Sequence, residues 1–307
     1  MHKMKFDKVD ILLVDPDRNS RDSLKMVLHN NGFRELRFGD TLEDIRFQIN
    51  YLTPDMMICS SELPDGDFCG FVAKIRHQKI GTNPFLPIIA TTWNPTPEMV
   101  RQVIESGADY LLTKPISTVQ LLDRIQLLVK YRKKFVVTND YVGPIRSRKD
   151  SDDKAIPKMD VPNTLKAKAT GEKIDHTGIQ QAIDAAIGEI NVRQLEGHAD
   201  EIGGLVARIV PNLEMGGKTG ETIKELIEHL IYIAKDTTRR LGGTRYDHVS
   251  GLCRTLIEVS NAIFSAEGAP NPKDVKLLMP LSKAIQAGFA DTGSATAARE
   301  ISASIKR

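Results

Sequence analysis

The chain has 307 residues, of which 41% are hydrophobic and 27% are charged. This composition is typical of a globular protein with a sizeable core, and the length predicts two domains of ordinary size. Lysine and arginine total 42 against 40 acidic residues, so the formal net charge is only +2. With so small a net charge, the overall charge of the chain gives no reason to expect binding to nucleic acid or to a membrane surface.

The cysteines and the N-terminal sequence bear on the compartment. Cys59, Cys69 and Cys253 form neither an even, closely spaced framework nor a paired metal motif, and the first two lie in apolar surroundings. We therefore expect a reduced, cytoplasmic compartment. The sequence MHKMKFDKVD has no apolar core of signal-peptide length. No run approaches the roughly 18–20 apolar residues of a membrane span.

Short apolar runs alternate with amphipathic segments over the first part of the chain. Five runs predict strands, at Ile11–Val14, Leu36–Phe38, Met56–Cys59, Pro87–Thr92 and Tyr110–Leu112. The segments that follow them predict helices, at 19–30, at 41–48, around 71–75, from 96–97 onwards and from 117 to 129. This alternation predicts an α/β fold, a doubly wound five-stranded parallel sheet with helices on both faces.

Polar residues stand where the predicted strands end. In a sheet of this kind, ligands meet the chain at the C-terminal ends of the strands. The residues at those ends are Asp15 and Asp17, then Ser60, then Thr92, then Lys114 with Pro115.

Four motifs, ILLVDPD, PDMMICSSELP, PIIATT and GADYLLTKP, together resemble the receiver domain of bacterial two-component response regulators, over roughly residues 8–131. The resemblance implies an acidic pair that helps to hold Mg²⁺ and an Asp that takes a phosphoryl group from a histidine kinase. It also implies a Thr or Ser and a Lys that contact the phosphoryl oxygens. Asp15 matches the first acid, Thr92 matches the Thr or Ser, and Lys114 matches the Lys. Pro115, directly after Lys114, also matches the family pattern.

Two positions depart from the family pattern. Pro16 stands where the second acid belongs, and Ser60 stands where the phosphoacceptor Asp belongs. A serine hydroxyl is a poor nucleophile without an adjacent base, and no His lies nearby in the motif. Because Pro16 supplies no side-chain oxygen to a hard cation, we expect neither Mg²⁺ binding nor another cofactor. The region is therefore interpreted as a degenerate, or pseudo-, receiver.

Other residues near this edge have two interpretations each. Asp17 could approach a metal, although helix capping is its simpler role. Glu62, two residues past Ser60, is a candidate surrogate acid. Lys114 either hydrogen-bonds Asp15 and the Ser60 hydroxyl to fix the loops, or retains a phosphate or anion site together with Thr92.

The remainder of the chain predicts a linker and a second domain. Residues 135–174 carry Pro144, Pro157, Pro162 and many charges, which predicts an extended linker after a receiver-like domain at 1–134. Within it, 135–137 is interpreted as a short strand or an extended run. Apolar residues at helical spacing from 175 to 307, with short glycine breaks, predict a separate all-α bundle.

Two features of the second domain suggest other chemistry. His198 and His248 are candidate phosphorylated histidines, although neither has the Lys and Gly spacing expected of a phosphotransfer helix. Four basic residues surround a glycine break, namely Lys235, Arg239, Arg240 and Arg245. The predicted helices are too long for a helix-turn-helix motif, and acidic residues lie just before, so a solvated face is the simpler interpretation.

We therefore expect a non-enzymatic signalling protein that acts through protein–protein contacts in a bacterial pathway, without binding nucleic acid. The resemblance also makes pairing with a second copy a prediction, through the face formed by the fourth helix, fifth strand and fifth helix. One alternative is a phosphorelay component that carries phosphate on a bundle His or on Glu62. A further alternative is a DNA-binding transcription regulator.

Overall fold

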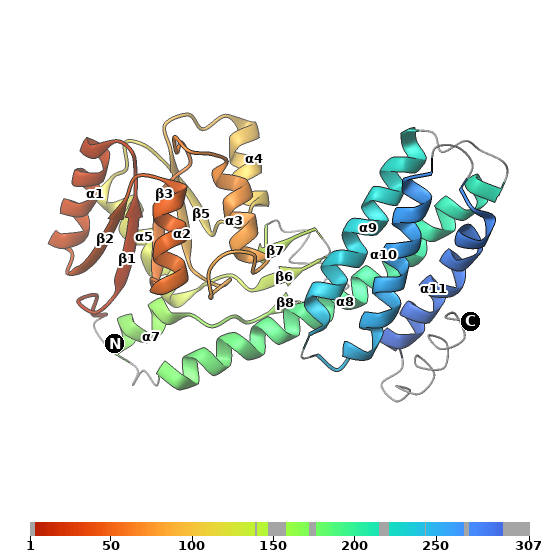
Figure 1. Cartoon of the computed structure of the whole chain (residues 1–307). Coiled ribbons are helices and arrows are strands. Elements are labelled where there is room, and N and C mark those ends of the chain that lie inside the picture. The colour runs from red at the N-terminus through yellow and green to blue at the C-terminus, as the bar shows by residue number, and fades with distance from the viewer. Residues whose placement is uncertain are drawn as a thin grey trace. The chain divides into compact units, whose positions relative to one another are not determined.

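The computed structural model describes residues 4–138, 140–146, 158–171, 176–214, 221–242, 244–266 and 270–290 (Figure 1). Contacts divide the chain into two compact units, Met1–Ile187 and Gly188–Arg307. This division lies within one helix, not at the predicted limits of 134 and 175. Within the described ranges, no helix is both long enough and apolar enough to span a membrane.

The first unit is built on a five-stranded parallel sheet with the strand order β2-β1-β3-β4-β5. Its strands are β1 (Asp10–Val14), β2 (Glu35–Gly39), β3 (Met56–Ser60), β4 (Ile88–Thr92) and β5 (Tyr110–Thr113). Its helices are α1 (Arg18–Asn30), α2 (Leu42–Tyr51), α3 (Phe68–Arg76), α4 (Pro97–Glu105) and α5 (Thr118–Lys130). The predicted α/β fold is confirmed.

The helices begin where side chains cap their free N–H groups. Each N-cap side chain accepts a hydrogen bond from the first turn; these residues are Asp17, Thr41, Asp67, Thr96 and Ser117. At α2 and α5 the bond is reciprocal, because the third helical residue also accepts from the N-cap. These caps fix where each helix starts, and therefore how each loop leaves its strand.

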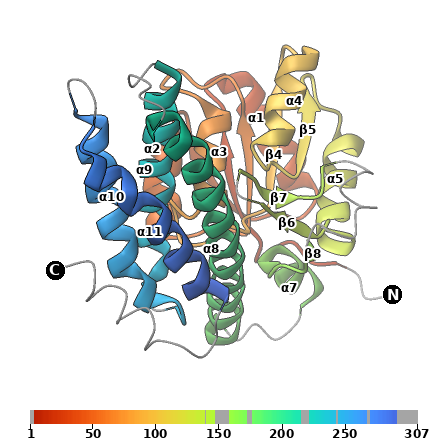
Figure 2. The same cartoon turned by 90° about the vertical axis from the view of Figure 1, so that its right-hand side faces the viewer.

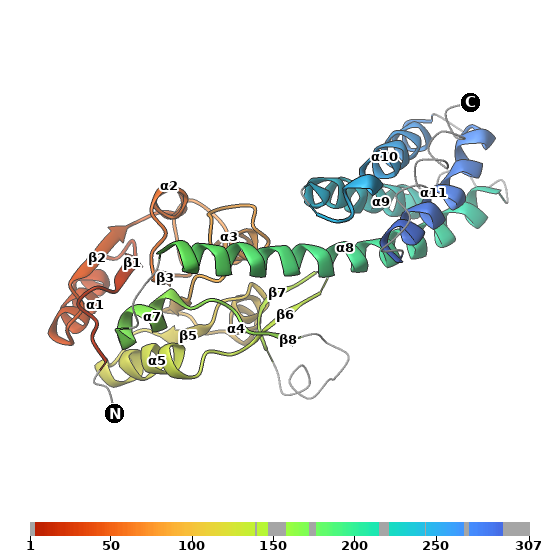
Figure 3. The same ribbon diagram turned by 90° about the horizontal axis from the view of Figure 1, so that it is seen from below.

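Alternate strand residues pack against two helical layers. Leu12 and Val14 of β1 join one core with side chains of α2, α3 and α4. Ile11 and Leu13 join the opposite core with side chains of α1 and α5. Figure 3 shows α2 and α3 on one side of the sheet and α5 on the other. Because both faces are covered, the inner strands β1, β3 and β4 are mostly apolar and buried, which explains why their sequences predicted them well.

The structure corrects the prediction of an extended linker. The described parts of 135–174 form a three-stranded antiparallel sheet, β6 (Phe135–Val137), β7 (Val142–Pro144) and β8 (Lys158–Met159), in the order β7-β6-β8. Helix α7 (Thr164–Thr170) follows and packs against α5. Phe135 is fully buried, and Leu165 belongs to the core on the α1–α5 side of the large sheet. This segment is thus part of the first unit.

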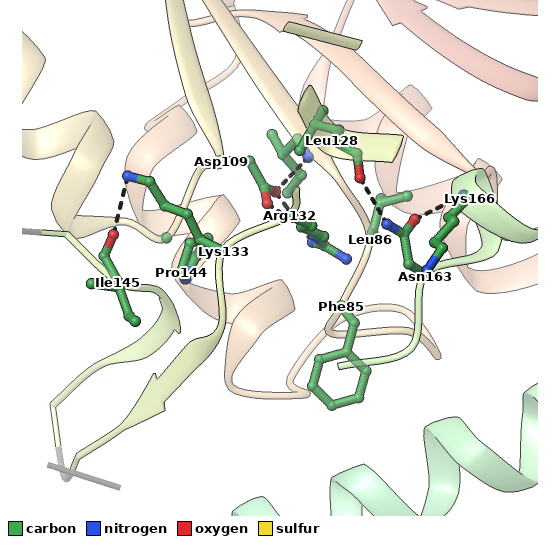
Figure 4. A network of polar contacts seen from close by, with 12 residues as sticks. Phe85, Leu86, Asp109, Leu128, Arg132, Lys133, Pro144, Ile145, Asn163 and Lys166 are labelled. Atoms are coloured by element: carbon green, nitrogen blue, oxygen red, sulfur yellow. Dashed lines mark hydrogen bonds and ion pairs between the residues drawn. The ribbon is translucent and has the colours of Figure 1, made fainter. Parts of the chain in front are cut away.

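A polar network fixes this segment to the large sheet (Figure 4). Arg132, just after α5, donates through Nε to Asp109 Oδ1 at 3.0 Å. Asn163 donates to the Leu128 carbonyl at 2.8 Å and caps α7 by accepting from the Lys166 N–H. Within the segment itself, the half-buried Lys168 pairs with Asp55 at 2.6 Å, so part of the charge that favoured an extended linker makes a contact with the large sheet.

Close backbone approach also seats the β6–β7 hairpin. A Cβ atom added at Gly143 would lie 2.9 Å from the Cα of Gly107, in the turn before β5. Gly107 has φ +95°, a conformation that residues with side chains rarely adopt. Both positions therefore require glycine.

The second unit is helical, as predicted. Helix α8 (His176–Glu214) begins in the first unit and continues into the second, followed by α9 (Glu221–Leu241), a 3₁₀ turn (Asp247–Val249), α10 (Ser250–Phe264) and α11 (Pro272–Ala290). Their apolar faces share one core, with α10 packed against both α9 and α11 (Figure 2). Helix α8 passes through Gly203 and Gly204 without a break, and Gln286 of α11 packs on Gly203.

Candidate functional site

The ends of β1, β3, β4 and β5 meet at one edge of the large sheet. Ser60 is paired in register with Thr91, and Thr92 with Thr113, so the loops after these strands emerge together. Asp15, Ser60, Thr92 and Lys114 are all buried at this edge, none of them more than 5% exposed. The structure therefore brings together four of the six residues that the sequence placed at strand ends.

Lys114 links three of the strand ends. Its Nζ atom lies 2.7 Å from Asp15 Oδ2 and donates to Ser60 Oγ at 3.1 Å. These are the two contacts expected of a structural role for this lysine. The Asp15 carboxylate is otherwise engaged as well, because it accepts from the Ser20 hydroxyl at 2.7 Å and from the Asp17 N–H at 3.0 Å. Removing the charges of Lys114 and Asp15 from water costs free energy. The buried pair therefore depends on these additional hydrogen bonds for its stability.

Glu62 occupies the centre of the site. Its Oε1 atom accepts from Thr92 Oγ1 at 2.5 Å and from the Trp93 N–H at 3.0 Å. Its Oε2 atom accepts from Ser60 Oγ at 3.0 Å. Partial burial is the largest influence on the Glu62 pKa and raises it. The hydrogen bonds from Thr92, Trp93 and Ser60, with the charge of Lys114, outweigh burial and leave the pKa below its ordinary value.

The neighbouring acidic residues have structural roles. Asp17 Oδ1 accepts from the Asn19 N–H at 2.9 Å, which confirms the capping interpretation. Asp65 accepts from the N–H groups of Leu42 and Glu43, at the start of α2. Pro115 follows a cis peptide bond from Lys114. None of these side chains joins the Glu62 network.

The residues present do not fit the Mg²⁺ site that the resemblance implies. Asp15 Oδ2 is already paired with an ammonium group, and Glu62 has both oxygens engaged by hydroxyl and amide donors. Pro16 and Ser60 supply no carboxylate. Across the ranges that the structure describes, no group of three or more His, Cys, Asp or Glu residues is arranged to hold a metal ion.

Sequence reasoning missed Trp93 and Ser20. Trp93 is 52% exposed and stands at the mouth of the site, with Lys114 Nζ 5.5 Å from its ring centroid. Beside it, a cavity of about 360 Å³ is bordered by α1, Trp93 and Pro115. The available signal for Trp93 was its position directly after Thr92, at the end of a predicted strand.

The two candidate histidines of the second unit are not exposed. The His198 side chain is 3% exposed; its Nδ1 lies 3.2 Å from Thr237 Oγ1, and its Nε2 lies 4.0 Å from Asp236 Oδ2. His248 is half-buried, and its Nε2 atom is buried without a hydrogen-bond partner among the described residues. A phosphotransfer histidine must reach a partner's site, so these positions count against that role.

The three arginines of the basic cluster in the second unit each have an acidic partner. Arg239 and Arg240 both pair with Asp236, at 2.6 and 2.8 Å, and Arg240 is only 4% exposed. Arg245 pairs with Glu196 at 3.4 Å. A surface that binds DNA phosphates needs free, exposed cations. The pairing of these arginines therefore disfavours the DNA-binding alternative.

Comparison with known proteins identifies a family for part of the first unit. Residues 11–126 match the family model of the response regulator receiver domain. This segment is a response regulator receiver domain. The resemblance found in the sequence motifs is thereby confirmed, and the match covers the large sheet and its helices as far as α5 but not the second unit.

Curated relatives match the receiver alone. The phosphate regulon transcriptional regulatory protein PhoB of Escherichia coli (strain K12) is 27% identical over 120 residues, which are 39% of this chain and 51% of that protein. The virulence transcriptional regulatory protein PhoP of Salmonella choleraesuis (strain SC-B67) is 28% identical over 123 residues, with the same two shares. The chain thus spans about half the length of the curated relatives that it matches.

Solved structures match over the same region. The chemotaxis response regulator CheY4 of Vibrio cholerae is 24% identical with a TM-score of 0.35, covering 38% of this chain and 96% of that one. A two-component response regulator from Clostridium difficile is 23% identical with a TM-score of 0.37, covering 40% and 98%.

Proposed function

We propose that this chain is a non-enzymatic, two-component signalling protein whose receiver acts by binding other proteins, without taking up a phosphoryl group at Ser60. One observation carries this proposal. A hydroxyl has one proton and two lone pairs. The Ser60 hydroxyl donates a hydrogen bond to Glu62 Oε2. Its two lone pairs accept hydrogen bonds from Lys114 Nζ at 3.1 Å and from the Glu62 N–H at 3.3 Å. No lone pair then remains to attack phosphorus.

The surroundings of Ser60 support the same conclusion. The residue is 1% exposed, so a phosphoryl donor has little access to its oxygen. The Ser60 hydroxyl donates its hydrogen bond to the Glu62 carboxylate, which is the nearest group that could act as a general base. Because the pKa of Glu62 is lowered, this carboxylate is a weak base. The group that takes the place of the phosphoacceptor is therefore neither accessible nor activated.

Exposed apolar side chains favour protein contacts. Trp93 is 52% exposed beside the site, and tryptophan is one of the residue types that contribute most to binding energy at protein interfaces. We expect the partners to be proteins of a two-component pathway, because the receiver is the module of such pathways. Cys59 and Cys253 are buried free thiols, in keeping with action in the cytoplasm. Pairing through α4, β5 and α5 stays a prediction, which light scattering would test.

Phosphorylation can be tested directly. The full chain is incubated with acetyl phosphate and Mg²⁺ and its intact mass is measured. A receiver domain that keeps the phosphoacceptor Asp, treated in parallel, shows that the donor is active. We expect no adduct on this chain. An adduct mapped to Ser60 or Glu62 would overturn the proposal, and one mapped to His198 or His248 would favour the phosphorelay alternative.

A further inference from the structure

We propose that the Glu62 carboxylate is a built-in ligand of an oxyanion-binding site, and that it holds the loop between β4 and α4 in one conformation. The inference rests on the proposed function, because it requires that no phosphoryl group occupies the site. The ligand class is a small oxyanion such as a carboxylate or inorganic phosphate. In this chain, the ligand comes from the loop after β3.

The donors of the site converge from two strands. Thr92 Oγ1 and the Trp93 N–H, from the end of β4, both donate to Glu62 Oε1, at 2.5 and 3.0 Å. The Ser60 hydroxyl, from the end of β3, donates to Oε2 at 3.0 Å. A hydroxyl and a backbone amide aimed at one oxygen form the kind of arrangement that binds a negatively charged oxygen strongly. Lys114 lies directly behind Ser60, 3.1 Å away, and adds positive charge.

The contact fixes the start of α4 through consecutive bonds. Thr92 Oγ1, held by Glu62, also accepts from the Asn94 N–H at 3.1 Å. The Asn94 carbonyl accepts from the Thr96 N–H at 2.9 Å, and Thr96 Oγ1 caps α4 by accepting from the Met99 N–H at 3.2 Å. A side chain 30 residues away in sequence therefore determines the path of the loop that leads into α4.

The same carboxylate excludes free anions. It occupies the acceptor position, and together with Asp15 it places two negative charges around the single ammonium group of Lys114. Removing it would leave the Thr92 hydroxyl and the Trp93 N–H without their acceptor and would lower the negative charge by one. An external oxyanion of similar size should then bind where Glu62 had been.

The experiment is chemical rescue in the full-length protein. Glu62→Ala is compared with the wild type and with Glu105→Ala, which removes an exposed glutamate from α4. The readouts are hydrogen exchange of the Trp93 amide and the fluorescence of Trp93, the one tryptophan in the sequence. Each protein is titrated with sodium acetate and with inorganic phosphate, and sodium chloride at equal ionic strength controls for screening.

In Glu62→Ala we expect exchange of the Trp93 amide to be about tenfold faster, because a hydrogen bond to an ionised acceptor is lost. Acetate or phosphate should reverse this change saturably, and neither should affect the wild type or Glu105→Ala. Glu62→Gln, which keeps the side-chain length but carries no charge, should show a smaller acceleration.

Two results would overturn the inference. Unchanged exchange in Glu62→Ala would show that the carboxylate does not hold the loop. Faster exchange that neither acetate nor phosphate reverses would show that the donors do not form an oxyanion site. Both results leave the proposed function standing. A phosphoryl adduct on wild-type Ser60, in contrast, would overturn that function whatever the exchange rates.

Discussion

Replacing Arg76 by Met should destabilise the receiver strongly. The side chain is fully buried. It donates to the carbonyls of Gly107, Pro84 and Leu86 at 2.8, 2.6 and 2.8 Å, and to Asp109 at 3.1 Å. Burial lowers the Arg76 pKa to about 10, against the opposing charge of Asp109, so the group stays charged at neutral pH. Arg76→Met keeps an unbranched apolar stem but removes every donor.

The size of the effect follows from which partners are left unpaired. Asp109 keeps Arg132 and the Ile88 N–H, so its charge is not abandoned. Three backbone carbonyls lose their donor, and a buried unsatisfied group costs about 1–3 kcal/mol. Because neighbouring groups relax in part, we expect a loss at the lower end of that sum, about 3–5 kcal/mol in the free energy of unfolding.

Urea unfolding measured by Trp93 fluorescence tests this expectation, because the single tryptophan reports on the receiver. The matched control is Arg34→Met, since Arg34 donates to the His29 carbonyl from an exposed position. The control should lose less than about 1 kcal/mol. If Arg76→Met lost no more than the control, our view that these carbonyls depend on the guanidinium would be refuted.

Three further outcomes follow from the structure. Lys114→Met should cost about 3–5 kcal/mol of receiver stability in the same urea assay, whereas Lys134→Met, which breaks an exposed pair, should cost about 0–1 kcal/mol. Asp236 has its pKa lowered to about 2, because its hydrogen bonds and charge contacts with two arginines outweigh the burial that raises it. Its contribution to stability is complete above the unfolded pKa and is lost as the pH falls through the folded value. The stability difference between wild type and Asp236→Asn, followed by helical circular dichroism, should therefore shrink from pH 5 towards pH 2, and a constant difference would contradict this. Cys69 is half-buried, and burial raises its thiol pKa to about 11; Cys253 is buried, with a thiol pKa of about 12. Ellman's reagent should modify Cys69 before Cys253, and the reverse order would be inconsistent with the structure.

The large sheet could be predicted from the sequence because its strands are short, mostly apolar segments that alternate with amphipathic helical segments. The five strands lie within one residue of their expected limits, and the helices expected from 41, from 96–97 and from 117 begin directly after the caps Thr41, Thr96 and Ser117. The site residues at strand ends followed from the topology. The limits of the strands and helices depend on local sequence, and the position of the site at the C-terminal ends of the strands is common to all sheets of this class.

Other features depend on contacts that no local pattern records. The strand alternative for 135–137 is confirmed by β6, but β7 and β8, with three and two residues, are too short to show any periodicity, and their segment is rich in charge. Glu62 could be named as a candidate acid from its position beside Ser60. Its actual contacts with Thr92 and Trp93 depend on how two loops approach each other in space.

Helix α7 has a practical consequence for shortened versions of this protein. The Lys5 N–H donates to the Ala169 carbonyl at 2.9 Å, and Lys168 pairs with Asp55 at 2.6 Å, so α7 is joined both to the beginning of the chain and to the start of β3. Cutting after α5 would strip Leu165 from the core and leave Asp55 without its cation. A stand-alone receiver should therefore extend at least to Gly171, the left-handed residue that terminates α7.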